Sequence, residues 1–113
     1  MSVSHITTHV LDTGSGKPAA GVPVTLQRLD GESWVRIAEG ATDADGRMQQ
    51  LGPDRLPQGT YRLAFDTGAY FAASGTETFF PEVLLTFGVV GSEAHYHVPL
   101  LLSPFAYSTY RGS

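Results

Sequence analysis

The stretch Tyr96-His97-Val98-Pro99-Leu100-Leu101-Leu102 decides the fold of this 113-residue chain. Side chains of a β-strand point alternately to its two faces. One alternate set suits a core, namely Tyr96, Val98, Leu100 and Leu102. The other set carries histidines among apolar residues, namely His95, His97, Pro99 and Leu101. The alternation therefore predicts a strand with one face in the core and an outward face that mixes leucine with histidine.

Similar alternation recurs in short segments along the rest of the chain, and glycine, proline and Asp-Gly turns separate these segments. We expect strands near residues 5–11, 22–29, 34–38, 60–65, 81–87, 95–102 and 105–110, and a short segment that starts at Arg47. Residues 13–21 are expected to form a loop. The segment from Asp66 to Ser74 predicts the one short helix, because Asp66 can cap its start and Gly75 can end it. This all-β pattern predicts one domain, residues 1–113, folded as an antiparallel β-sandwich.

The composition excludes several classes of function. The chain has no cysteine, so it has neither disulfides nor a thiolate nucleophile or metal ligand. Its net charge is −4 without a basic run, which argues against a nucleic-acid surface. No apolar stretch is long enough to span a bilayer. Neither a signal peptide nor a peroxisomal C-terminal signal is visible, so we expect a cytoplasmic protein.

The histidines gather on one predicted surface. When the alternation is extended to the first and last strands, the outward set consists of His9, Leu11, His97, Leu101, Ser108 and Tyr110. Because leucines lie among these histidines, we expect this face to be buried between copies of the chain. The sequence assigns no role to His5 or His95. The sequence ends in an aromatic residue, a cation, a glycine and a serine. This pattern predicts a C-terminal tail that is held against the protein and contributes to a site.

A metal site is the first chemistry that the histidine spacing suggests. His95 and His97 point the same way from a strand, and His9 could supply a third zinc ligand. No carboxylate or thiolate clusters beside them in the sequence, so we expect no metal. Ser108 lacks the strand–turn–helix surroundings of a serine nucleophile, and we assign it to packing at the interface.

Two glycine-containing segments look like binding loops but lack the required residues. Gly14-Ser15-Gly16-Lys17 is followed by Pro18, where a phosphate loop needs serine or threonine. Asp43-Ala44-Asp45-Gly46 lacks the further acids of a calcium loop. The second segment predicts a tight turn that holds Arg47 in a fixed place, although alternation does not tell us on which face Arg47 lies. From the residues alone, a solvated charge at the edge of a strand is the better interpretation of Arg47.

Several motifs together resemble the transthyretin-related family, in particular its 5-hydroxyisourate hydrolases, over essentially the full length of the chain. The segments that carry the resemblance are Thr8-His9-Val10-Leu11-Asp12, Gly16-Lys17-Pro18-Ala19, Thr42-Asp43, Asp45-Gly46-Arg47, Phe79-Phe80-Pro81-Glu82, His95-Tyr96-His97-Val98-Pro99-Leu100-Leu101 and the tail from Ser103 to Ser113. The end Tyr110-Arg111-Gly112-Ser113 is the most specific, because the hormone-carrying transthyretins lack both it and the histidines. Ala106 departs from the glycine expected in many members.

The resemblance implies a transthyretin-like β-sandwich of two four-stranded sheets with one short helix. It also implies a homotetramer, a dimer of dimers, with active sites in the central channel. The implied reaction belongs to urate degradation: hydrolysis of the N1–C6 bond of 5-hydroxyisourate to 2-oxo-4-hydroxy-4-carboxy-5-ureidoimidazoline, without metal or organic cofactor. Residue by residue, the implied catalytic set is His9, Arg47 and His97. The expected substrate-binding set is His9, Arg47, Ser108, Tyr110, Arg111 and Ser113.

The expected mechanism uses a neutral histidine, His9 or His97, as the base that takes a proton from water. Arg47 is expected to hold the substrate oxygens and the developing oxyanion, and nearby cations help to keep the histidines neutral. A small-molecule carrier of the transthyretin type is the alternative, but it has no need for these residues. A non-catalytic adhesion or carbohydrate-binding module is a second alternative.

Overall fold

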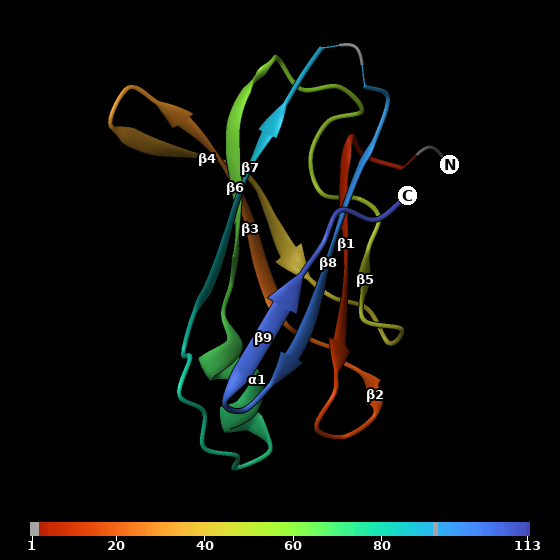
Figure 1. Cartoon of the computed structure of the whole chain (residues 1–113), viewed down its shortest axis with the longest axis vertical. Coiled ribbons are helices and arrows are strands. Elements are labelled where there is room, and N and C mark those ends of the chain that lie inside the picture. Colours follow the sequence, from red (N-terminus) through yellow and green to blue (C-terminus); the bar gives the residue numbers. More distant parts are fainter. Residues whose placement is uncertain (1–2, 92) are drawn as a thin grey trace.

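Two β-sheets pack face to face in the computed structural model, which describes residues 3–91 and 93–113 (Figure 1). The first sheet contains β1 (Ile6–Asp12), β2 (Lys17–Pro18), β5 (Arg47–Met48), β8 (Tyr96–Ser103) and β9 (Ala106–Thr109). The second sheet contains β3 (Pro23–Asp30), β4 (Ser33–Ala41), β6 (Gly59–Phe65) and β7 (Val83–Val89). The helix α1 (Thr67–Ala73) follows β6. The β-sandwich with one short helix confirms the predicted fold class.

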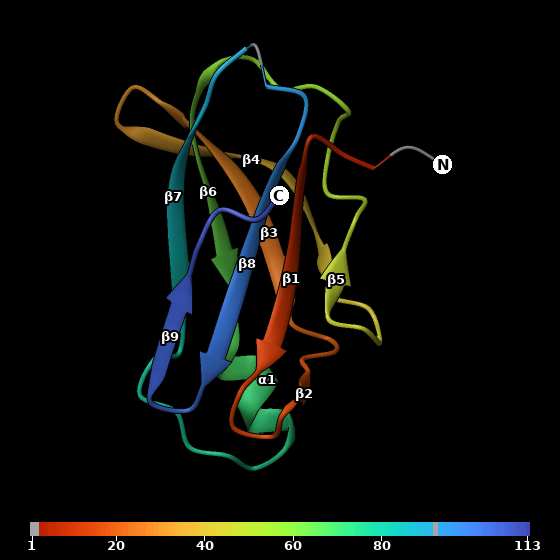
Figure 2. The same ribbon diagram turned by 45° about the vertical axis from the view of Figure 1, so that its right-hand side comes forward.

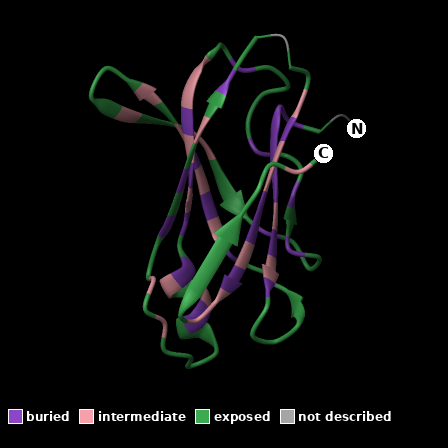
Figure 3. Ribbon diagram, viewed as in Figure 1, coloured by how far each residue is buried: buried purple, intermediate pink, exposed green. Residues whose placement is uncertain are grey.

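The core lies between the sheets and takes alternate side chains from both. Its fully buried members include Ile6, Val10, Leu26, Leu63, Phe65, Leu100 and Leu102. Figure 3 shows buried and less buried residues alternating along the strands. Tyr96 is also buried, and its hydroxyl bonds the backbone N–H and carbonyl of Val90, so its polar atom is satisfied. The alternation that predicted the core face of the 96–102 stretch is thus confirmed.

The helix forms where capping residues predicted it. The Asp66 side chain accepts the N–H of Ala69 at 3.0 Å and so caps the first turn. Phe71 is buried against the core, and Gly75, with φ +67°, ends the helix in a conformation that favours glycine. No helix among the described residues has the length and apolar character needed to cross a membrane.

Two details of the first sheet differ from the prediction. The strands β1 and β8 pair in parallel rather than antiparallel, because the chain crosses to the second sheet and back between them. This sheet has five strands rather than four, because the two-residue strands β2 and β5 both pair with β1. The strand β2 falls in the segment expected to be a loop, and its residues are exposed, so they give no alternation signal.

The strands β7 and β9 lie at the same side of the sandwich, each at the edge of its sheet (Figure 2). All four residues of β9 are exposed. Their outer backbone groups have no strand partner within the described chain. Such paired edges are suited to strand addition by another copy.

Candidate active site

The parallel register of β1 and β8 places the outward residues in rows. Thr7 lies opposite His97, and His9 lies opposite Pro99. Because paired residues in a sheet point to the same face, Thr7, His9 and His97 share one surface. The predicted outward grouping of the two histidines is therefore confirmed, and the register adds Thr7 to it.

Arg47 joins this surface through a tight turn. It lies opposite His9 on β5, a position that alternation alone could not give. The Asp43 carboxylate accepts the N–H groups of Asp45 and Arg47, both at 2.9 Å, and closes the turn. Gly46 has φ +75°, and a side chain there would collide with a backbone carbonyl of β1. The tight turn predicted from the sequence is therefore present, and the pairing of β5 with β1 places Arg47 beside His9.

The imidazole rings are oriented by hydrogen bonds. His97 Nδ1 lies 2.8 Å from the Thr7 hydroxyl, and His95 Nε2 lies 3.0 Å from the same hydroxyl. His9 Nε2 lies 2.9 Å from the carbonyl oxygen of Asp45. Because a carbonyl only accepts, His9 carries its proton on Nε2, which leaves Nδ1 open when the ring is neutral. Among the described residues, His97 Nε2 has no hydrogen-bond partner, so both catalytic candidates present an open ring nitrogen.

The electrostatics favour a neutral His97. Burial lowers the pKa of His97 below its ordinary value, and the nearby His95, His9 and Arg47 lower it further. Within the part of the chain that is described, no acidic side chain forms a salt bridge with Arg47. The site therefore combines a ring that accepts protons at neutral pH with a guanidinium that is not neutralised.

The tail passes directly over His97. The Gly112 N–H donates to the His97 carbonyl at 2.8 Å, and the two residues form an isolated β-bridge. A Cβ at Gly112 would lie 2.6 Å from His97 Cδ2, so only glycine fits. The contact brings Ser113 to a cavity of about 170 Å³ whose lining includes Thr7, Arg47 and His97.

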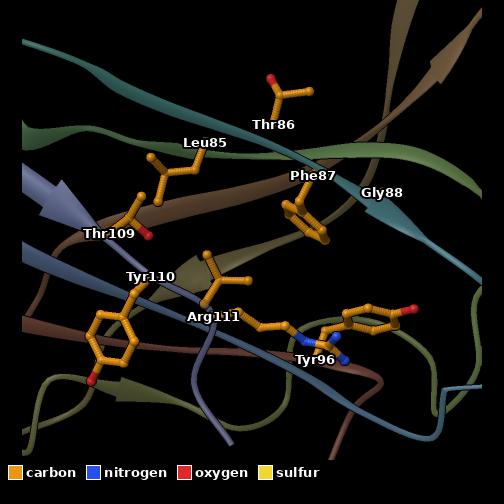
Figure 4. A pocket seen from close by; sticks show the side chains of 9 residues that line it. Leu85, Thr86, Phe87, Gly88, Tyr96, Thr109, Tyr110 and Arg111 are labelled. Atoms are coloured by element: carbon orange, nitrogen blue, oxygen red, sulfur yellow. The ribbon is translucent and has the colours of Figure 1, made fainter.

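The other predicted substrate-binding residues, His9 among them, do not line this cavity. The Arg111 guanidinium stacks on the Tyr96 ring, 4.7 Å from its centroid, and reaches the Glu93 carboxylate at 3.7 Å. It lines a separate, mainly apolar groove of about 290 Å³ between β7 and the β8–β9 pair (Figure 4). Tyr110 is 58% exposed and points away from Arg111 in Figure 4. Ser108 is exposed and lies on β9 opposite Leu101.

Sequence reasoning missed the part played by Thr7 and His95. Thr7 has the same parity as His9 on the first strand, and His95 the same parity as His97, so alternation held the signal. Without the parallel pairing of β1 and β8, however, nothing showed that Thr7 would sit between the two β8 histidines. No group of three histidine or acidic side chains among residues 3–91 and 93–113 is arranged to hold a metal ion.

The chain resembles known proteins over nearly its whole length. The model of the HIUase/Transthyretin family matches residues 6–112. A 5-hydroxyisourate hydrolase of Caulobacter vibrioides is 50% identical over 115 residues, which cover 98% of this chain and 100% of that protein. The structure of Klebsiella pneumoniae 5-hydroxyisourate hydrolase matches with a TM-score of 0.86 at 42% identity and covers 100% of both chains. Transthyretin from Sparus aurata matches with a TM-score of 0.90 at 33% identity and covers 96% of each chain.

Proposed function

The chain belongs to the HIUase/Transthyretin family, and we propose that within it the chain is a 5-hydroxyisourate hydrolase whose active site is formed by His9, Arg47 and His97. The main support for this site is that two histidines and an arginine lie on the same face of the sheet. Each histidine has an open ring nitrogen, and the arginine has no salt bridge among the described residues. A carrier needs a surface that binds, whereas this arrangement supplies a base and a cation for a developing oxyanion.

His97 is the proposed base. In the hydrolysis, a water oxygen adds to the C6 carbonyl of 5-hydroxyisourate and the N1–C6 bond then breaks, so water must lose a proton and N1 must gain one. The lowered pKa of His97 keeps the ring neutral at neutral pH, and Thr7 holds Nδ1, so Nε2 faces the water. A positioned histidine of this kind accelerates such proton transfers by about 10²–10⁴-fold.

Arg47 and His9 have the complementary roles. The Arg47 guanidinium offers a planar fork of donors to the oxygen that becomes negative when water adds. His9 lies opposite Arg47 in the sheet, and its open Nδ1 orients the water or a substrate N–H. The Asp45 carbonyl that fixes the His9 ring belongs to the turn that also holds Arg47, so one turn positions both groups.

The tail completes the proposed substrate site. Ser113 lines the cavity beside His97, and we propose that it contacts the substrate there. Ser108 and Tyr110 are exposed, and we propose that they meet the substrate across the channel between subunits. For Arg111 a substrate contact requires that its guanidinium leave Tyr96 and Glu93, where it anchors the tail.

The proposed assembly is a homotetramer, a dimer of dimers. The edge strands β7 and β9 support dimer formation by strand addition, since they lie at the same side and each has one outer edge without a strand partner within the described chain. The His97 cavity of about 170 Å³ is small beside the roughly 300–1,000 Å³ of typical ligand pockets. A second outward face packed over it would enclose the substrate.

The test is the ultraviolet decay of 5-hydroxyisourate, generated freshly from urate by urate oxidase, with and without the protein. We expect loss of the substrate signal well above the spontaneous rate, and light scattering that gives the mass of a tetramer. A tetramer that leaves the spontaneous rate unchanged would contradict the hydrolase and favour the carrier. His9→Asn then tests the site: a near-wild-type rate in that variant would remove His9 from it.

A further inference from the structure

Thr7 connects two imidazole rings. Its side chain is only 3% exposed, and its hydroxyl oxygen lies 2.8 Å from His97 Nδ1 and 3.0 Å from His95 Nε2. The two rings are stacked with their centroids 6.4 Å apart. One hydroxyl group therefore bridges His97, the proposed base, and His95, which does not belong to the proposed catalytic set.

Counting hydrogens limits what this hydroxyl can do. A threonine hydroxyl has one hydrogen and can also accept. It therefore donates to one ring nitrogen and accepts an N–H from the other. If His97 Nδ1–H donates to Thr7, then Thr7 donates to the lone pair of His95 Nε2, and His97 Nε2 is unprotonated. In the reverse order, His97 Nε2 carries the proton. The protonation states of the two rings are thus coupled through Thr7.

We propose that Thr7 and His95 form a proton relay behind His97, with Thr7 as the residue that sets which His97 nitrogen carries the proton. The relay rests on the proposed hydrolase function. When water adds to C6, its proton passes to His97 Nε2, the His97 Nδ1 proton passes to the Thr7 oxygen, and the Thr7 hydroxyl proton passes to His95 Nε2. The carbonyl π electrons move onto oxygen. When the N1–C6 bond breaks, the same three transfers run backwards and N1 takes the proton.

The relay moves positive charge from His97, where its surroundings disfavour it, to His95. The charged and titratable groups that face His97 are His95 before β8, His9 on β1 and Arg47 on β5. His9 and Arg47 lie in the same row of the sheet as Pro99. On this face His97 therefore lies one row away from them, and His95 lies two rows away. Burial and these three neighbours all disfavour an imidazolium at His97. Passing the charge to His95 increases its distance from Arg47.

The experiment compares Thr7→Val, Thr7→Ser and Thr67→Val. Thr67 is the matched control, because it is fully buried, donates its hydroxyl to the Phe80 carbonyl at 2.5 Å, and lies at the start of α1 rather than in the lining of the His97 cavity. We expect Thr7→Val to lower kcat by about 10–100-fold while KM changes by less than about threefold, since only proton transfer is impaired. Thr7→Ser keeps the hydroxyl and should restore most of kcat. Thr67→Val should lose stability but keep the wild-type kcat.

A measurement independent of turnover accompanies the kinetics. Nitrogen-15 NMR of the histidine side chains at neutral pH reports which ring nitrogen is protonated. We expect His97 in the wild type to carry its proton on Nδ1, and Thr7→Val to shift it towards Nε2.

Different results would contradict the relay and the hydrolase function. A wild-type His97 protonated on Nε2, or a Thr7→Val variant with the kcat of Thr67→Val, would overturn the relay while hydrolysis remains normal. Absence of hydrolysis by the wild type would instead contradict the proposed function. A His95→Asn variant with unchanged kcat and an unchanged pH profile would remove His95 from the relay.

Discussion

His5 directly precedes β1, and its carbonyl accepts the N–H of Tyr96, the neighbour of His97 on β8, but the rings of the two histidines have opposite surroundings. His5 is 1% exposed, and its Nδ1 accepts the Leu56 N–H at 2.8 Å while its Nε2–H donates to the Glu93 carbonyl at 3.0 Å. Its ring also packs edge-on against Tyr96. His97 is only half-buried, and among the described residues its ring hydrogen-bonds with the Thr7 hydroxyl alone.

The comparison shows what distinguishes a structural histidine from a reactive one. Both partners of His5 belong to the backbone, and an N–H only donates while a carbonyl only accepts, so the proton of His5 has a single place. The partner of His97 is a hydroxyl, which does both, so its proton can change place. Burial alone does not separate the two roles, but the chemistry of the hydrogen-bond partners does.

Replacing His97 should produce the largest effect. In His97→Asn we expect kcat to fall by about 10²–10⁴-fold, because the general base is lost while a polar side chain remains. The rate of ultraviolet decay of 5-hydroxyisourate measures the loss. The circular dichroism spectrum and the molecular mass from light scattering should be unchanged. A variant that retains a tenth or more of the wild-type rate would assign the base to another group.

Replacing His5 should have the opposite profile. In His5→Phe the buried Leu56 N–H loses its acceptor, so the free energy of unfolding should fall by about 1–3 kcal/mol. Urea denaturation at a fixed protein concentration measures this loss, and activity per folded molecule should stay near that of the wild type. A stable His5→Phe protein with little activity would contradict the purely structural role of His5.

Replacing Arg47 should shift the pKa of His97 as well as weaken catalysis. The Arg47 guanidinium contributes to the lowered pKa of His97, so Arg47→Ala should raise that pKa towards its ordinary value. The acid limb of the kcat/KM profile should then move to higher pH, because His97 becomes protonated and inactive sooner on acidification. An acid limb that stays in place would mean that another group controls it.

The smallest expected effect is on stability against acid. Because the pKa of His97 is lowered in the folded protein, the unfolded chain takes up its proton first as pH falls below the ordinary value of 6.5. This group therefore destabilises the fold from about that pH downwards, until the folded pKa is passed. The difference in unfolding free energy between wild type and His97→Asn, measured from pH 7.5 to 5 (roughly this window), should change in favour of the variant. A constant difference would contradict the lowered pKa.

Strand alternation and turn chemistry predicted much of this molecule. They gave the core face of β8, the helix capped by Asp66, and the shared outward face of His9 and His97. These features depend on neighbours in sequence, whose geometry a strand or a helix fixes. The tight turn before Arg47 belongs to the same group, because its hydrogen bonds join residues at most four apart.

The features that could not be predicted depend on which strands meet. The parallel pairing of β1 and β8 joins residues about ninety positions apart, and it alone places Thr7 between His95 and His97. The position of Arg47 opposite His9 likewise needs the pairing of β5 with β1. The stacking of Arg111 on Tyr96 depends on the path of the tail after β9, which no periodicity describes.

The site draws on β1, β5, β8 and the tail, and its histidines come together through the pairing of β1 with β8, one of the longest-range contacts of the fold. Contacts between distant segments are slow to form, because a long loop must close before they stabilise anything. We therefore expect catalytic competence to be acquired late in folding, because a chain in which β8 has not paired with β1 lacks the hydrogen bond between His97 and Thr7. In refolding kinetics, the recovery of activity should lag behind the recovery of β-sheet signal, which makes this enzyme a reporter of its own completed folding.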